Sequence, residues 1–73
     1  MKSEKFLQMA TSMLADEFVR LGNLPIEVAT ELSSKIIPTI DWEDDALMHK
    51  GFGWMAKTYL RYNMPTDLVA FAV

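Results

Sequence analysis

The sequence predicts a compact all-α domain of three or four helices, and three observations predict it. Apolar residues recur at helical spacing along three stretches of the 73-residue chain. Capping residues or proline precede these stretches, and glycine or proline ends the first two. Hydrophobic residues make up 51% of the chain and aromatic residues 11%, which is enough to fill one core. We therefore expect residues 1–73 to form a single domain.

The first predicted helix runs from Ser3 to Leu21. Ser3 is a favoured N-cap residue, and Glu4 lies in the first turn, where the helix dipole favours an anion. Gly22 follows as a good helix terminator. One stripe of side chains recurs at helical spacing: Phe6, Met9, Ala10, Met13, Leu14, Phe18 and Leu21. The stripe predicts that Met9 and Met13 fill the core.

The second predicted helix begins at Leu24-Pro25 and ends at Pro38, because proline is favoured in the first turn and cannot continue a helix. Its predicted buried stripe contains Val28, Ala29, Leu32 and Ile36, and its predicted exposed ladder contains Glu27, Glu31 and Lys35. Residues 33–35 are assigned to the helix surface. The short connection before Pro25 predicts an antiparallel pair of helices.

The third predicted helix is capped by Asp41 and continues to about Arg61 or Tyr62. Two glycines, Gly51 and Gly53, interrupt its apolar stripe. Glycine inside a helix costs about 1 kcal/mol relative to alanine. Either the helix breaks at this point, or another backbone approaches it closely.

The end of the chain permits two interpretations. Pro65 predicts a turn, and Thr66 is a possible cap for a short last helix over residues 67–73. The same segment has the alternating apolar residues of an extended strand.

Composition excludes several classes of protein. The net charge is −3, whereas a free-standing DNA-binding protein usually has a basic stripe. The chain contains no cysteine, so disulfides, thiol catalysis and cysteine-bound zinc are excluded. No apolar run is long enough for a signal peptide or a membrane span. We expect a non-enzymatic, cytoplasmic protein without a cofactor, because the single histidine cannot complete a catalytic triad.

The turn from residue 41 to residue 45 is the first candidate binding site. Trp42 would be its apolar anchor, and Glu43, Asp44 and Asp45 would attract a basic partner. The alternative is an acid-rich helix start with no further role. A calcium loop is excluded because Phe52 occupies the position of the bidentate glutamate. Two possible ligands on one face, Asp45 and His49, are too few for a metal site.

The segment from Lys50 to Trp54 is the second candidate. Phe52 and Trp54 would be presented to a partner beside the Lys50 cation, and the alternative is a kink or a close helix contact. Lys57 and Arg61 continue a small basic cluster, with tyrosines interleaved. Three charges hold nucleic acid weakly, so contact with it is expected to be peripheral at most, within a larger complex.

Taken whole, the chain resembles the small phage-encoded regulators of bacterial RNA polymerase. The resemblance depends on the length, the opening Met-Lys-Ser-Glu-Lys-Phe, the lack of cysteine and the acidic helical build around Asp-Trp-Glu-Asp-Asp. It implies a protein of the host bacterial cytoplasm that docks on the β and β′ subunits. Such a protein inhibits initiation by displacing the sigma factor and promotes antitermination.

The sequence also shows a second, shorter resemblance, and it permits two alternative functions. Residues 61–65, Arg-Tyr-Asn-Met-Pro, resemble a segment of the small theta subunit of bacterial DNA polymerase III, but five residues are too few to transfer a fold or partner. One alternative function is a small helical DNA-binding repressor, which would need a basic recognition helix. The other is a structural or assembly protein whose small core is completed by self-association.

Overall fold

The structure is a computed structural model that describes residues 2–62. It contains three α-helices and one short 3-10 helix, and no strand occurs within these residues, which confirms the all-α prediction. The elements are α1 (Glu4–Gly22), α2 (Ile26–Ile36), η1 (Ile37–Thr39) and α3 (Asp45–Tyr62). The predicted turn at Pro65 and the segment 67–73 lie outside the described residues.

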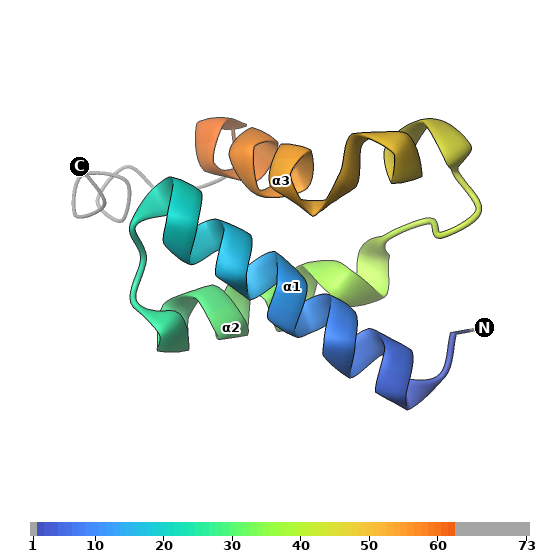
Figure 1. Cartoon of the computed structure of the whole chain (residues 1–73), viewed down its shortest axis with the longest axis horizontal. Helices are drawn as coiled ribbons and strands as arrows, with labels where there is room; N and C mark the ends of the chain where they lie inside the picture. Colours follow the sequence, from blue (N-terminus) through green and yellow to red (C-terminus); the bar gives the residue numbers. More distant parts are fainter. Residues whose placement is uncertain (1, 63–73) are drawn as a thin grey trace.

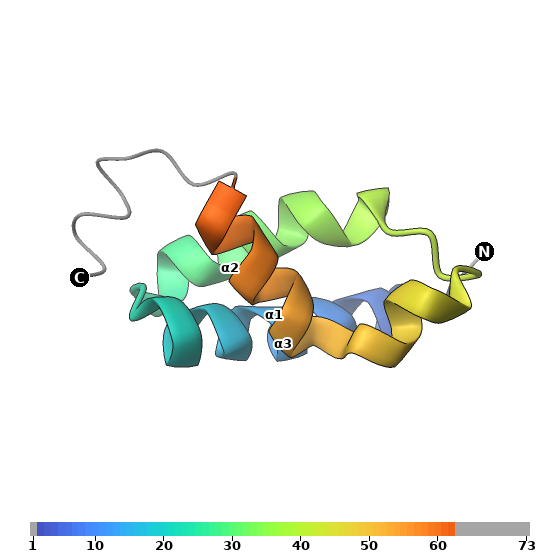
Figure 2. The same cartoon turned by 90° about the horizontal axis from the view of Figure 1, so that it is seen from above.

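Helix α1 lies at the centre of the arrangement. The chain reverses after α1, so that α2 runs antiparallel to it, and reverses again before α3 (Figure 1). Figure 2, seen from above, shows α1 and α2 side by side and α3 crossing over α1, with its C-terminal half leaning towards α2. Both helices pack against α1, whereas the backbones of α2 and α3 make few close approaches to each other. The predicted antiparallel pair is therefore present, and α1 joins the two other helices into one body.

The predicted N-cap of α1 is confirmed, whereas the predicted terminating residue at its other end is wrong. The Phe6 N–H donates to Ser3 Oγ at 3.1 Å, so Ser3 is the N-cap as predicted. At the other end Asn23, not Gly22, adopts the left-handed conformation that terminates the helix. Gly22 belongs to the last turn and is buried, and a Cβ atom there would lie 2.9 Å from Leu60 Cδ1. A larger residue at this position would require the Leu60 side chain of α3 to shift.

The core is formed mainly by small and aliphatic side chains around Phe18. It contains Ala10, Leu14, Ala15, Phe18, Leu24, Ala29, Ile37 and Ala56. The prediction that Met9 and Met13 fill this core is wrong, because they are 57% and 50% exposed. The buried arc of α1 extends from Ala10 through Leu14 towards Ala15, which turns both methionines to the outside.

Helix α2 begins after Pro25, whose carbonyl accepts the Ala29 N–H at 2.9 Å. The helix ends at Ile36, and Pro38 lies in the 3-10 turn that follows it. The assignment of Ser33 to the helix surface is wrong. Ser33 is fully buried, and its Oγ has no hydrogen-bond partner among residues 2–62.

Helix α3 begins later than predicted and contains a break. Asp44 is its N-cap, because Asp44 Oδ1 accepts the Leu47 N–H at 3.2 Å and its carbonyl accepts the Met48 N–H. Asp41 caps the preceding turn instead, accepting the Glu43 N–H at 3.0 Å. The backbone leaves the helical region at Gly51, with φ 77° and ψ −179°. Of the two explanations for the glycines, the break in the helix is the one observed.

None of the helices described between residues 2 and 62 is both long enough and apolar enough to cross a lipid bilayer.

Candidate functional site

The residues predicted to bind a partner lie in three different environments. Trp42 and Phe52 are partly buried in an aromatic cluster. The acidic residues 43–45 are exposed at the start of α3. Lys50 and Trp54 lie on the outside of α3. The fold therefore separates Phe52 from Trp54, which the sequence placed in one candidate site, and brings Phe52 to Trp42 of the other candidate site.

The aromatic cluster consists of Phe6, Trp42 and Phe52. The rings of Phe6 and Trp42 meet edge to face, with centroids 5.1 Å apart and planes at 82°. Trp42 and Phe52 meet at 6.3 Å and 69°. Edge-to-face contacts of this kind contribute about 0.5–1.5 kcal/mol beyond the burial of their area. The cluster joins the start of α1 to the turn before α3 and to the break in α3, so its first role is to hold these segments together.

The acidic turn also has a structural role. The Asp44 carboxylate accepts a backbone N–H at the start of α3, and the Asp41 carboxylate accepts one in the turn before it. Glu43 and Asp45 are exposed. Asp45, Met48 and His49 line a shallow hollow of about 210 Å³. Within residues 2–62, no group of three or more potential ligands is placed to hold a metal ion.

The outer face of α3, defined here by Lys50, Trp54, Lys57, Thr58, Arg61 and Tyr62, combines cations with exposed rings. Trp54 is 41% exposed and Tyr62 72%. Lys50 Nζ lies 4.5 Å from the centroid of the Trp54 ring, and the Arg61 guanidinium lies 5.9 Å from that of Tyr62. Cation–π contacts at exposed sites contribute about 0.5–1 kcal/mol.

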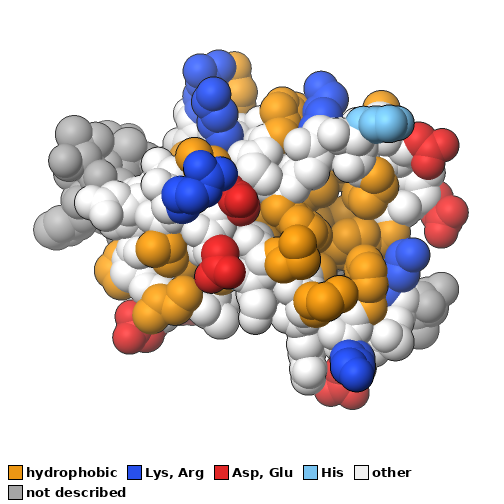
Figure 3. Space-filling view, viewed as in Figure 1, with side chains coloured by type: hydrophobic (Ala, Val, Ile, Leu, Met, Phe, Trp, Pro, Cys, Tyr) orange, Lys and Arg blue, Asp and Glu red, His pale blue; other side chains and the backbone are white. Residues whose placement is uncertain are grey.

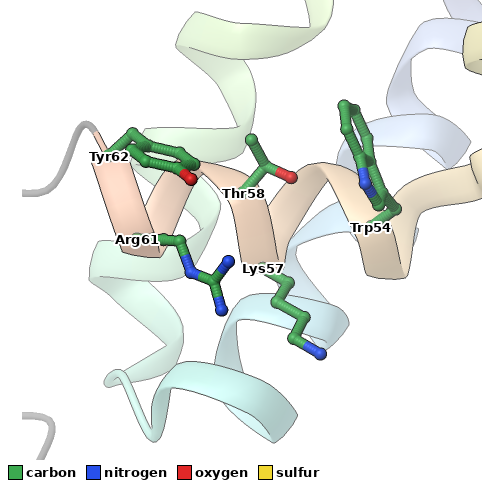
Figure 4. A pocket seen from close by; sticks show the side chains of 5 residues that line it. All are labelled: Trp54, Lys57, Thr58, Arg61 and Tyr62. Carbon is green, nitrogen blue, oxygen red and sulfur yellow. The ribbon is translucent and has the colours of Figure 1, made fainter.

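A shallow pocket of about 190 Å³ lies on this face. Figure 4 shows the Trp54 and Tyr62 rings at its two ends, with Thr58 between them and Lys57 and Arg61 along one side. The spacing explains the arrangement, since residues four apart on a helix lie one above the other. No acidic side chain lines this pocket.

A second, larger hollow lies between η1 and α3, and we refer to it as the η1–α3 groove. Its volume is about 370 Å³. Trp54 and Thr58 line both this groove and the pocket on the outer face, so the two hollows adjoin at these side chains. The full lining is Ile36, Thr39, Ile40, Asp41, Leu47, Trp54, Met55, Thr58 and Tyr59.

Charge is distributed unevenly over the molecule. Figure 3 shows Lys and Arg side chains along the edge formed by α3, and Asp and Glu side chains at the end where α3 begins. Hydrophobic side chains gather on the face between them. Near the break in α3, Arg20 of α1 forms an ion pair with Glu17, whose carboxylate adjoins Gly53. The chain is acidic overall, but the outer face of α3 is basic.

Several residues of the site were not found from the sequence. The groove is lined partly by Ile36, Ile40 and Leu47, which sequence reasoning treated as core residues or left unassigned. Thr58 could have been found, because it stands four residues from both Trp54 and Tyr62. The groove residues could not have been found from the sequence, because they come from separate segments that only the folded structure brings together.

Comparisons of the chain with protein-family models, with curated proteins and with solved structures find no match.

Proposed function

We propose that this chain is a protein-binding domain that regulates transcription by docking on bacterial RNA polymerase. The observation that carries the docking role is Trp54, a large aromatic residue that is 41% exposed and lies against the Lys50 ammonium. A partly exposed tryptophan beside an apolar groove has the character of a binding hot spot.

The choice of polymerase as partner is supported by the resemblance of the whole chain to the small phage regulators. On this proposal the chain is non-enzymatic and works in the host bacterial cytoplasm. It contacts the β and β′ subunits, displaces the sigma factor to inhibit initiation, and lets elongating polymerase pass terminators. Exposed acids at residues 43–45 would add electrostatic attraction to a basic surface of the enzyme.

The direct test is a pull-down with the full chain from bacterial lysate, followed by binding to purified core polymerase. We expect the β and β′ subunits to be recovered and the bound sigma factor to decrease as the chain is added. Trp54→Ala should abolish recovery. Ile26→Ala is the matched control, because Ile26 is also an exposed apolar residue, at 51%, but lies on α2 outside the described hollows.

Two results would reject the proposal. One is a pull-down that recovers no polymerase subunit. The other is recovery that Trp54→Ala and Ile26→Ala reduce equally, because the contact would then not depend on the outer face of α3.

A further inference from the structure

We propose that the outer face of α3 and the η1–α3 groove together bind an acidic, amphipathic helical segment of a partner protein. This inference deepens the proposed function and rests on it only in that the partner is a protein. It specifies the chemistry of the bound segment, which the proposed function leaves open.

The first argument is the continuity of an apolar and a basic surface. Trp54 and Thr58 form a ridge that lines both hollows. On one side of this ridge lies the groove, with Leu47, Met55 and Tyr59 in its wall. On the other side lie Lys57 and Arg61 (Figure 4). A ligand that covers the ridge must therefore present apolar groups to one side and anions to the other.

The second argument is charge. Within residues 2–62, Lys50, Lys57 and Arg61 take part in no ion pair, although the chain has a net charge of −3. The one carboxylate lining the groove is Asp41, and it already accepts the Glu43 N–H. Its position disfavours anions on the η1 side of the groove. The acidic side of the ligand is thus directed over Lys57 and Arg61, and its apolar side into the groove.

The third argument is the class of ligand. An amphipathic helix has the required apolar stripe and charged flank, and it binds grooves through residues at i, i+3, i+4 and i+7. A single-stranded nucleic acid would stack its bases on the rings of Trp54 and Tyr62. Lys50 already lies over one face of the Trp54 ring, and nucleic acid would leave the apolar groove empty. The whole surface therefore favours a peptide.

The test uses the full chain, labelled with nitrogen-15, and three probes. The first probe is a synthetic peptide of about 14 residues, four helical turns, with leucines at i, i+3, i+4 and i+7 and glutamates on its other face. The second has lysine at every glutamate position. The third is a short oligothymidylate. The readouts are the indole N–H resonance of Trp54 and the backbone resonances of residues 36–62.

We expect the leucine–glutamate peptide to shift the Trp54 indole and the groove residues in a saturable manner. The lysine peptide should bind at least about tenfold more weakly, and raising the salt from about 50 to about 500 mM should weaken the acidic peptide, because exposed charges are screened. The double variant Lys57→Glu/Arg61→Glu should weaken the acidic peptide by about tenfold or more. Its matched control, Lys5→Glu/Lys35→Glu, has the same net charge and should bind as the unaltered chain does.

Three results would overturn the inference: no shift with the acidic peptide, equal binding of both peptides, or an oligothymidylate that shifts Trp54 and Tyr62 while the peptides do not. Failure of the proposed function is distinguishable from these. If polymerase is not recovered but the acidic peptide binds, polymerase is the wrong partner. The inference that the bound segment is an acidic amphipathic helix then stands. If polymerase binds equally well to Lys57→Glu/Arg61→Glu, the inference is wrong and the proposed function stands.

Discussion

At the scale of single residues, the two tryptophans have opposite environments. Trp42 is partly buried between the rings of Phe6 and Phe52. Trp54 is 41% exposed and its ring contacts the Lys50 ammonium. The same residue type therefore serves the fold at one position and is available for binding at the other.

Alanine at each tryptophan should separate these roles. Trp42→Ala should lower the free energy of unfolding by about 2–3 kcal/mol, since it removes two ring contacts and part of a buried side chain. Trp54→Ala should change it by less than about 1 kcal/mol, because only a surface cation–π contact is lost. Urea unfolding followed by circular dichroism measures both. Equal losses would contradict the separation.

Ser33 is the one buried side chain between residues 2 and 62 whose polar atom has no partner. A buried hydroxyl without a hydrogen bond is unfavourable, and alanine is the better helix former. Ser33→Ala should therefore raise the free energy of unfolding by about 0.5–1.5 kcal/mol. Ser34→Ala is the control, because Ser34 is exposed and bonds the Glu31 carbonyl. A loss of stability in Ser33→Ala would show that the hydroxyl has a partner.

At the scale of elements, the break in α3 depends on Gly51 and not on Gly53. The φ of 77° with ψ near 180° at Gly51 is a conformation that only glycine adopts readily. A Cβ atom at Gly51 would meet nothing within 4 Å, so the requirement lies wholly in the backbone. At Gly53 the φ is ordinary, and a Cβ atom would make normal contact with the Glu17 carboxylate at 3.5 Å.

Substitution by alanine should consequently change the free energy of unfolding in opposite directions at the two glycines. Gly51→Ala should destabilise the protein by about 1–3 kcal/mol through backbone strain. Gly53→Ala should be neutral or stabilise it by up to about 1 kcal/mol, since alanine favours the helix. Thermal unfolding of the two variants side by side measures the difference. If Gly51→Ala proved the more stable of the pair, the break would not depend on the positive φ.

The start of α3 allows stability and binding to be tested separately. Asp44→Ala removes the cap of the Leu47 N–H and should lower the free energy of unfolding by about 1 kcal/mol. Glu43→Ala removes an exposed carboxylate and should change it by less than about 0.5 kcal/mol. Polymerase binding should weaken in Glu43→Ala if the acids attract the partner. Unchanged binding in that variant would assign the acidic turn to helix capping alone.

At the scale of the whole molecule, α1 is the element on which the others depend. Its Phe18 is fully buried and meets Tyr59 of α3 edge to face, at 5.7 Å between centroids. Helices α2 and α3 each pack closely against α1, whereas their backbones make few close approaches to each other. Loss of packing on α1 should therefore unfold all three helices together.

The variant Phe18→Ala tests this cooperativity. Replacing a buried phenylalanine with alanine costs about 3–5 kcal/mol, and a core in a domain of this size supplies about as much in total. Phe18→Ala should thus be largely unfolded, with loss of the helical circular dichroism signal, while Ile26→Ala remains folded because Ile26 is exposed. A Phe18→Ala protein that keeps α2 or α3 alone would contradict the central role of α1.

Much of the helical order was predictable from local chemistry. The Ser3 cap, the reversal near Pro25 and the interruption at the glycines of α3 are consequences of backbone preferences that a residue type carries with it. The failures concern which side of a helix is buried. Met9 and Met13 satisfy the helical spacing but lie outside the core, and Ser33 is polar but lies inside it.

Only part of the candidate site was predictable, because the sequence does not show which side of a helix is buried. Residues 50–54 stood out because of their composition, and Trp54 with Lys50 remains at the surface. The sequence did not show that Trp42 and Phe52 contact each other, or that Trp54 borders a groove with Ile36 and Ile40. These relations join residues that are distant along the chain.

The sequence by itself determined that this protein is helical, where its helices begin within a few residues, and that it is acidic and free of cysteine. Tertiary structure alone decided which face of α1 became the core, which aromatic rings were buried, and where a groove opened between η1 and α3. The physical reason is that capping and helix propensity act over a few neighbouring residues, whereas burial depends on which surfaces two helices bring together.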